Sequence, residues 1–324
     1  MKHSTKFTFQ KMTIAALCAG VGLLASAQAA AFPNKPVQIV VPFAAGGGTD
    51  ITTRAMQEPM KEALGTNVVI KNTAGAGGTI GVAEAARARP DGYVLAMAPV
   101  GPLTTQPHLQ SLPYDVDSFE YVCLAYSAPS IITVSKDAPY NDLEELVTYA
   151  KDNPGEIMIA IDAIGSIPHV ASLALAEEAD IDVDYLPVDG NGPALKALLD
   201  GTADVFVAHQ SFLAQNLEQL KGLALLQPEP LESMPNLKTA KEQGFDLDFP
   251  IWGGLVAPVN TPEDVVVTLD DACHTAVASD GFQKRMEQLG QPSSYMSSAD
   301  FDEFVRAQYE RNKKLLHSAG FETK

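Results

Sequence analysis

Cysteine is scarce in this chain of 324 residues. Three cysteines occur, and Cys18 falls in an N-terminal segment that we expect to be removed. The remaining two, Cys123 and Cys273, are too few for a disulfide framework. Each lies among apolar residues, so the sequence predicts two buried free thiols. No group of cysteines and histidines has the spacing of metal ligands, so neither a metal nor a cofactor is expected.

Positive charge is also scarce. The chain has 22 Lys and Arg against 40 Asp and Glu, a formal net charge of −18. A surface this acidic argues against nucleic acid and against anionic membranes as partners. Beyond the N-terminus no apolar run is long enough to span a membrane.

The first residues have the pattern of a secretory signal peptide. Lys2, Lys6 and Lys11 precede a short apolar stretch, 12–24, and Ala27-Gln28-Ala29 forms an A-x-A cleavage site. We therefore expect residues 1–29 to be removed near Ala29. Their loss takes three lysines and no acid, so the charge falls from −18 to −21.

One stretch organises the rest of the chain. A β-branched run, 39–43, indicates a buried strand, and Gly46-Gly47-Gly48 breaks it before Thr49 and Asp50, which are good helix N-caps. A helix is expected over 51–64. Because backbone N–H groups and the helix dipole converge at such a loop, the stretch predicts an anion site made of main chain. A tight turn without a ligand remains the alternative. The Lys-Ser/Thr pair of a nucleotide-binding Walker loop is missing.

The pattern occurs twice. A short strand, 68–70, is followed by glycines at positions 75, 77 and 78 and by a predicted helix, 80–87. Loops at the same edge of a parallel sheet converge on one point, as ligand sites in open α/β sheets do. The two glycine loops are therefore expected to lie side by side.

Strands and helices alternate through the remainder, which indicates an α/β fold with parallel sheets. Strands are expected at 93–98, 121–126, 131–134, 157–161, 184–188, 204–208, 223–226 and 252–258. Helices are expected at 142–150, 167–178, 193–199, 210–217, 263–279, 281–289 and 298–319. The loops after Ile161, Val188 and Ala208 form a second set of strand-end loops.

Two histidines, His169 and His209, follow strands of the second half and are candidates for ligand binding. Ser166 with His169 allows a nucleophile and base, but their spacing at a helix start fits capping better, and no G-x-S-x-G elbow is present. Asp50 is expected to cap its helix or to pair with Arg54 rather than to contact a ligand.

Several motifs, taken together, resemble one receptor family. They are Pro33-Asn34-Lys35-Pro36, residues 39–43, Gly46-Gly47-Gly48-Thr49-Asp50, Ala74-Gly75-Ala76-Gly77-Gly78, Pro90-Asp91-Gly92-Tyr93, Leu112-Pro113-Tyr114-Asp115, residues 254–258 and Thr261-Pro262. Their order and spacing resemble the extracytoplasmic solute receptors of tripartite tricarboxylate transporters, the Bordetella uptake gene family. The resemblance covers essentially the whole mature chain.

This resemblance implies an α/β, type II-like periplasmic binding protein with two lobes joined by a hinge, each lobe a mainly parallel sheet flanked by helices. Lobe 1 would comprise residues 30–128 and 253–324, and lobe 2 residues 129–252. The lobes would close on a small organic carboxylate held by main-chain amides and ordered waters. The protein would be a periplasmic monomer and not an enzyme, delivering its ligand to a tripartite tricarboxylate-type membrane permease. A sensor domain for a signalling partner and an exported Ser/His hydrolase remain the alternatives.

The resemblance also implies ligand-binding positions. Lobe 1 would contribute Phe43, Ala44, Ala45, Thr49, Ala76, Gly77, Gly78, Val100 and Gly101, and lobe 2 Ser166, His169, Asp189 and His209.

Three departures from the family pattern bear on the ligand. The loop after residue 161 is made apolar by Ile164, Ile167 and Pro168, Asp189 stands where relatives often carry lysine, and the turn 99–101 lacks serine and threonine. No arginine is evident that would pair an additional buried carboxylate, whose burial alone is costly. A citrate-like ligand is therefore not favoured, and Asp189 is expected to face a donor group.

Overall fold

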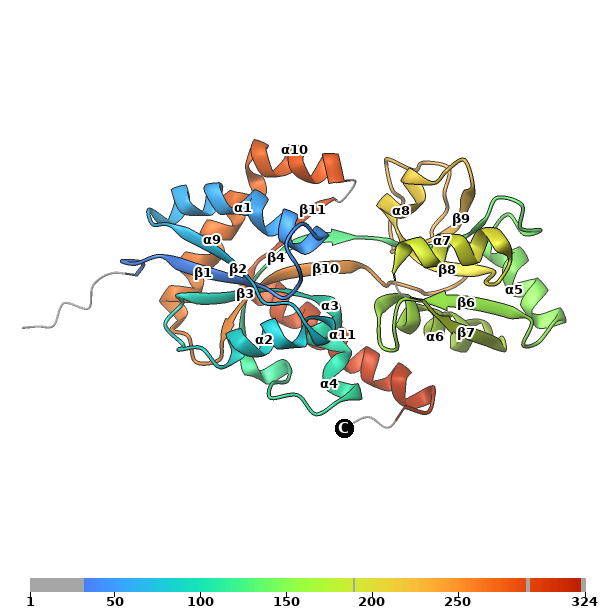
Figure 1. Ribbon diagram of the computed structural model, residues 1–324, viewed down its shortest axis with the longest axis horizontal. Coiled ribbons are helices and arrows are strands. Elements are labelled where there is room, and N and C mark those ends of the chain that lie inside the picture. Colours follow the sequence, from blue (N-terminus) through green and yellow to red (C-terminus); the bar gives the residue numbers. More distant parts are fainter. Residues whose placement is uncertain (1–31, 189, 290–291, 322–324) are drawn as a thin grey trace, which may run out of the picture.

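The computed structural model describes residues 32–188, 190–289 and 292–321. The predicted signal peptide and Asp189 lie outside them. The described chain forms two β-sheets that lie side by side, each with helices on both faces (Figure 1). We call the six-stranded sheet with its helices lobe 1 and the five-stranded sheet with its helices lobe 2. The predicted two-lobed α/β fold is confirmed.

The lobe 1 sheet has the order β11-β4-β10-β3-β1-β2. Its strands are β1 Val37–Val41, β2 Val68–Asn72, β3 Val94–Pro99, β4 Phe119–Ala128, β10 Ile251–Pro258 and β11 Ser293–Met296. The pairs of β1 with β2 and with β3 are parallel, whereas β10 pairs antiparallel with both β3 and β4. The sheet is thus mixed, with a parallel core at the glycine-rich end of the chain.

Helices cover both faces of this sheet and bury a separate apolar cluster on each. They are α1 Gly48–Leu64, α2 Thr79–Ala86, α3 Val100–Thr104, α4 Gln106–Leu109, α9 Glu263–Ala278, α10 Asp280–Leu289 and α11 Ser298–Ser318, with the short turns η1 Ala76–Gly78 and η2 Val116–Ser118. Figure 1 shows α1, α9 and α10 above the sheet and α2, α3 and α11 below it.

The lobe 2 sheet has the order β7-β6-β8-β5-β9. Its elements are β5 Ser130–Ser135, α5 Leu143–Asp152, β6 Ile157–Ile161, α6 Ile167–Ala179, β7 Val183–Pro187, α7 Asn191–Asp200, β8 Val205–His209, α8 Gln210–Gln215, β9 Leu220–Leu226 and η3 Lys241–Gln243. β6 pairs parallel with β7 and β8, and β5 pairs antiparallel with β8 and β9. This sheet too has a parallel core of three strands.

The chain passes between the sheets twice, from β4 to β5 and from β9 back to β10. The two crossings meet, because the buried Ser130 hydroxyl donates to the Phe249 carbonyl oxygen over 2.6 Å. Arg311 of α11 lies 4.0 Å above the Phe249 ring and donates to the carbonyl of Asp248. The sequence predicts that lobe 2 spans residues 129–252. The assignment of β5 to β9 to one sheet supports these bounds, which stay a prediction.

The prediction of free thiols is wrong. Cys123 of β4 and Cys273 of α9 form a disulfide, with their Cα atoms 6.5 Å apart. Both are completely buried, as expected. The pairing arises because α9 packs directly across β4, a contact between residues 150 positions apart that no local pattern reveals.

Helix starts were predicted with mixed success. Ser166 caps α6, as expected, and Asp142, one of the two candidates at positions 141 and 142, caps α5. Neither Thr49 nor Asp50 caps α1; the N-cap is Gly47, without a side-chain bond. The reason is that the Asp50 carboxylate turns back and accepts from the Gly46 amide instead. In the described ranges, no helix is both long and apolar enough to cross a bilayer.

Candidate functional site

The strand order identifies the same kind of position in both lobes. In lobe 1, β1 lies between β2 and β3, so the next two strands of the chain are added on opposite sides of it. In lobe 2, β6 lies between β7 and β8 in the same way. At such a reversal of strand order, a crevice forms outside the carboxyl ends of the strands, and ligands of open α/β sheets bind there. Figure 1 shows these two edges turned toward each other. The predicted loops all follow these strands.

The loop between β1 and α1 is braced by Asp50. Its carboxylate accepts from the Gly46 amide over 2.8 Å, from Arg54 Nε over 2.9 Å and from Asn72 Nδ2 over 2.8 Å. Burial alone would raise the pKa of Asp50, but the bonds from Arg54, Gly46 and Asn72 together lower it to about 2. Asp50 is therefore a structural anion whose charge is balanced within the protein, and the predicted pairing with Arg54 is confirmed.

Some amides of this loop are used within the protein and some are not. Gly46 donates to Asp50 and Gly47 to the Ala44 carbonyl. By contrast, the amides of Ala44, Ala45, Gly48 and Thr49 donate to no other described residue. Residues 44–48 are solvent-exposed. The start of α1 thus presents unpaired N–H groups together with the positive end of a 17-residue helix.

The second glycine loop touches the first. Gly78 has φ +96°, and a Cβ placed on it would lie 2.9 Å from Cγ of Pro102 and 3.1 Å from Cζ of Phe43. Gly77, at φ +63°, also occupies the left-handed region that favours glycine. The amides of Ala76 and Gly77 belong to exposed residues and donate to no partner in the described part of the chain. The two loops therefore converge, as the sequence predicted.

The remaining lobe 1 positions adjoin these loops. Val100 and Gly101 were expected in a turn, but they open the short helix α3, whose Pro102 contacts Gly78. The Thr49 side chain is hydrogen-bonded to the buried Tyr126 hydroxyl of β4.

In lobe 2, Ser166 and His169 organise the β6–α6 loop. The Ser166 hydroxyl accepts from the backbone amide of His169 over 3.3 Å, and His169 Nδ1 accepts from the Gly165 amide over 3.0 Å. The His169 ring is 2% exposed and packs edge-to-face on Tyr185 and on Phe321, which follows α11 of lobe 1. Burial lowers its pKa to about 4. The hydrolase alternative requires a hydrogen bond between the His169 ring and the Ser166 hydroxyl, and these two groups do not form one. The ring instead accepts from the Gly165 amide and thereby fixes the loop that carries Ser166.

Two further polar groups lie at the ends of β6 and β8. His209 ends β8, is half-buried, and has a pKa lowered to about 4 by burial. Asp162 directly follows β6, and its buried Oδ1 atom has no hydrogen-bond partner within residues 32–188, 190–289 and 292–321. The sequence analysis did not identify Asp162 as a candidate site residue. The feature that could have indicated it is its position, as an acid directly after a buried strand at the predicted ligand-binding edge.

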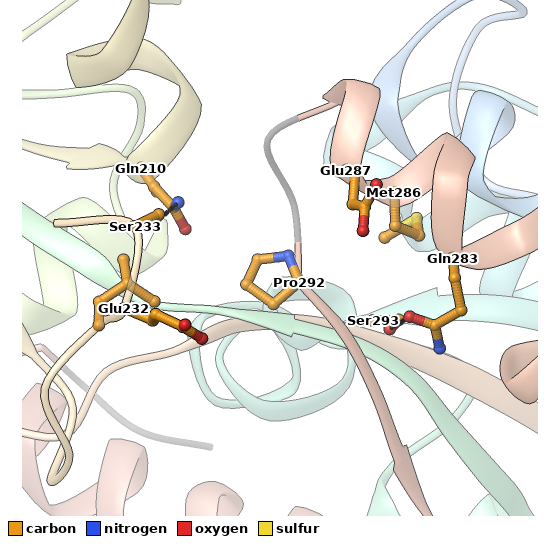
Figure 2. A pocket seen from close by; sticks show the side chains of 9 residues that line it. Gln210, Glu232, Ser233, Gln283, Met286, Glu287, Pro292 and Ser293 are labelled. Atoms are coloured by element: carbon orange, nitrogen blue, oxygen red, sulfur yellow. Dashed lines mark hydrogen bonds between the residues drawn. The ribbon is translucent and has the colours of Figure 1, made fainter.

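A pocket of about 550 Å³ lies between the lobes, and Gln210 after β8 is one of its lining residues. Gln210, Glu232 and Ser233 of lobe 2 line one side, and Gln283, Met286, Glu287 and Ser293 of lobe 1 line the other (Figure 2). Gln210 follows His209 directly, so this pocket adjoins the lobe 2 strand ends.

The structure thus brings the predicted positions to two facing edges. Phe43, Ala44, Ala45, Thr49, Ala76, Gly77, Gly78, Val100 and Gly101 share the lobe 1 edge, and Ser166, His169 and His209 the lobe 2 edge. Asp189 lies outside the described residues. Within those residues no cluster of three or more His, Cys, Asp or Glu could hold a metal.

Known proteins share this architecture. The family model described as tripartite tricarboxylate transporter family receptor matches residues 52–321. A UPF0065 protein of Bordetella pertussis is 29% identical over 314 residues, which cover 96% of each chain. A TctC solute-binding protein from Polaromonas superposes with a TM-score of 0.81 at 26% identity, covering 89% of this chain and 99% of that one. The periplasmic binding protein BugD has a TM-score of 0.72 at 33% identity, covering 90% and 99%.

Two similar structures hold ligands. MatC of Rhodopseudomonas palustris with bound malate has a TM-score of 0.71 at 29% identity, covering 88% of this chain and all of that one. An R. palustris protein with adipate has a TM-score of 0.74 at 25% identity, covering 90% and 99%. The family match extends over most of the chain, and its relatives are solute-binding proteins rather than enzymes. This chain belongs to the tripartite tricarboxylate transporter receptor family, also known by its Bug members.

Proposed function

We propose that this protein captures a small organic carboxylate between its lobes and delivers it to a tripartite tricarboxylate-type membrane permease. The observation that carries the proposal is the pair of touching glycine loops. Their amides at Ala44, Ala45, Gly48, Thr49, Ala76 and Gly77 donate to no partner within the described chain. The malate and adipate bound to similar proteins support a carboxylate as the ligand class.

Recognition by main chain follows from the composition of the lobe 1 edge. Arg54, on the first turns of α1, is already paired with Asp50 and donates to the Asn72 side chain. A carboxylate would therefore be bound by N–H dipoles and by the positive end of α1. Each hydrogen bond to a charged group contributes about 1.5–3 kcal/mol, so the amides of the two loops together would supply a large part of the binding free energy.

Lobe 2 would complete the site on closure. Ser166 lies at the N-terminus of α6, a helix of 13 residues, in a loop held by His169. Because Phe321 of lobe 1 packs against His169, the geometry of this loop depends on the arrangement of the lobes. Closure would thus bring the two helix N-termini onto one ligand and exclude bulk water from it.

Location and partner follow from the same proposal. A buried disulfide forms and persists in oxidising compartments, and Cys123–Cys273 supports an extracytoplasmic location. Together with the predicted signal peptide, 1–29, it supports export to the periplasm. There a monomeric receptor would present its ligand to the permease.

A thermal-shift and calorimetry panel tests the proposal. Malate, adipate and chain-matched monocarboxylates are compared with glucose and with chloride. We expect at least one carboxylate to raise the melting temperature, while glucose does not. A panel in which only neutral solutes stabilise the protein contradicts a carboxylate site.

A further inference from the structure

The lobe 2 side of the site has hydrogen-bond acceptors that lack donors. Asp162 follows β6, the central strand of the parallel core, where strand order reverses. Its Oδ1 atom is buried and has no hydrogen-bond partner among the residues that the structure describes. Burial raises the pKa of this carboxyl. A buried acceptor that is left unpaired costs free energy, so native proteins rarely retain one without a role.

A second unpaired acceptor lies at the neighbouring strand end. Gln210 follows β8 and is 8% exposed. Its Nε2 donates to the Ser233 hydroxyl over 2.8 Å, while its buried Oε1 accepts from no donor in the described part of the chain. Figure 2 shows the oxygen end of the Gln210 amide on the wall of the interlobe pocket. Two adjacent parallel strands are therefore each followed by an acceptor that lacks a donor.

The pocket beside Gln210 is lined by carboxylates rather than by cations. Glu232 and Glu287 line the interlobe pocket from opposite lobes, and none of its lining residues is Lys or Arg. The β6–α6 loop, 162–166, likewise contains no basic residue. Burial lowers the pKa of His209 to about 4, so its ring is neutral near pH 7 and adds no positive charge. This is the opposite of the lobe 1 edge, where unpaired donors predominate.

We infer that the ligand carries, at the end away from the carboxylate held by lobe 1, a hydrogen-bond donor group that Asp162 and Gln210 recognise. The donor is a hydroxyl or an ammonium group; both satisfy the unpaired acceptors. A second carboxylate at this end would face Asp162 with no cation to pair it, and like charges in a partly buried site repel strongly. The inference rests on the proposed function and assigns Asp162 as a specificity-determining residue.

A chain-matched ligand series tests this assignment. Hexanoate, 6-hydroxyhexanoate, 6-aminohexanoate and adipate share six carbons and differ only in the distal group; butanoate, 4-hydroxybutanoate, 4-aminobutanoate and succinate repeat the series at four carbons. Calorimetry should give at least ten-fold tighter binding for a hydroxy or amino acid than for the diacid of the same length. The ratio of the hydroxyl to the ammonium arm identifies which donor is used.

Two variants connect the preference to these residues. Asp162→Asn keeps the shape of the side chain and removes its charge, so the preference for a donor over the diacid should fall at least ten-fold. Gln210→Met removes the second acceptor with little change in volume and should reduce the preference in the same direction. Asp152→Asn, an exposed acid at the end of α5, is the control and should leave it unchanged.

The outcomes separate the two proposals. Diacids that bind as tightly as the donor-bearing acids, or a preference unchanged in both Asp162→Asn and Gln210→Met, overturn the role of Asp162 while leaving a carboxylate receptor intact. If no acid of either series binds, the carboxylate proposal fails as well.

Discussion

The side-chain amide of Asn72 donates to the backbone carbonyl of Phe43 over 3.1 Å. This bond ties the end of β2 to the loop after β1, so the two glycine loops are held in one geometry. The same side-chain amide donates to Asp50, and Arg54 donates to the side-chain oxygen Oδ1 of Asn72 over 3.0 Å. Asn72 therefore supports the amide array without belonging to it.

Asn72→Ala should loosen the lobe 1 edge. The change removes hydrogen bonds to Phe43, Asp50 and Arg54, at about 0.5–1.5 kcal/mol each and more where a charge is involved. We expect unfolding in urea to show a loss of about 1–3 kcal/mol and calorimetry to show at least ten-fold weaker carboxylate binding. Asn67→Ala, an exposed asparagine just before β2, is the matched control. Equal affinities in the two variants would remove Asn72 from the support of the site.

Gly47→Val should block ligand approach while the fold survives. Gly47 has φ −74°, which any residue adopts, and a Cβ there meets only the Ala44 carbonyl at 3.4 Å. Its side chain would cover the amides at the start of α1. We expect a circular dichroism spectrum like that of the wild type and a carboxylate affinity reduced more than ten-fold. Gly281→Val, which meets nothing within 4 Å near the start of α10, should bind normally. Undiminished binding in Gly47→Val would exclude this loop from the site.

His169 should make stability depend on pH. Its folded pKa of about 4 lies below the ordinary value of 6.5, so the unfolded chain binds a proton that the folded chain does not. The free energy of unfolding should therefore fall as pH decreases from 6.5 to 4, by ~3 kcal/mol for this residue, and change no further above 6.5. Urea unfolding of His169→Gln should show a correspondingly smaller fall. Identical slopes for the two proteins would contradict a buried neutral imidazole.

The disulfide should stabilise the protein without affecting recognition. Cys123 and Cys273 are 150 residues apart, and cross-linking a loop of that size contributes about 3–5 kcal/mol in the chain-entropy account. The Cys123→Ala/Cys273→Ala protein should unfold at lower urea concentration, with unchanged affinity at low temperature because neither residue lies at the facing edges. A double variant as stable as the wild type would show that the bond does not constrain the unfolded chain.

Local signals predicted much of the fold. The glycine loops, the alternation of strands and helices and the cap at Ser166 each depend on a few adjacent residues, and the structure has them where the sequence indicated. The start of α1 was predicted wrongly because the Asp50 carboxylate can either cap the helix or hydrogen-bond to the preceding loop. Its hydrogen bonds with Asn72 and Arg54 decide between the two, and the contact with Asn72 depends on the tertiary structure.

Features that depend on distant parts of the chain were not predicted. The disulfide requires α9 to pack on β4, and β11 joins the lobe 1 sheet by pairing antiparallel with β4, a strand from much earlier in the chain. Ser293–Met296 is too short and polar to be read as a strand without its partner β4. Asp162 looked like any loop acid, because the absence of a partner for its carboxylate is a property of the folded chain.

The central claim is that main-chain amides of the two glycine loops bind a ligand carboxylate. A crystal structure of the protein with a carboxylate identified by the binding panel tests it most directly. We expect both carboxylate oxygens within about 3 Å of backbone nitrogens in the 44–49 and 76–77 loops, with no Lys or Arg side chain in contact. A carboxylate held by basic side chains, or bound away from these loops, would contradict the account.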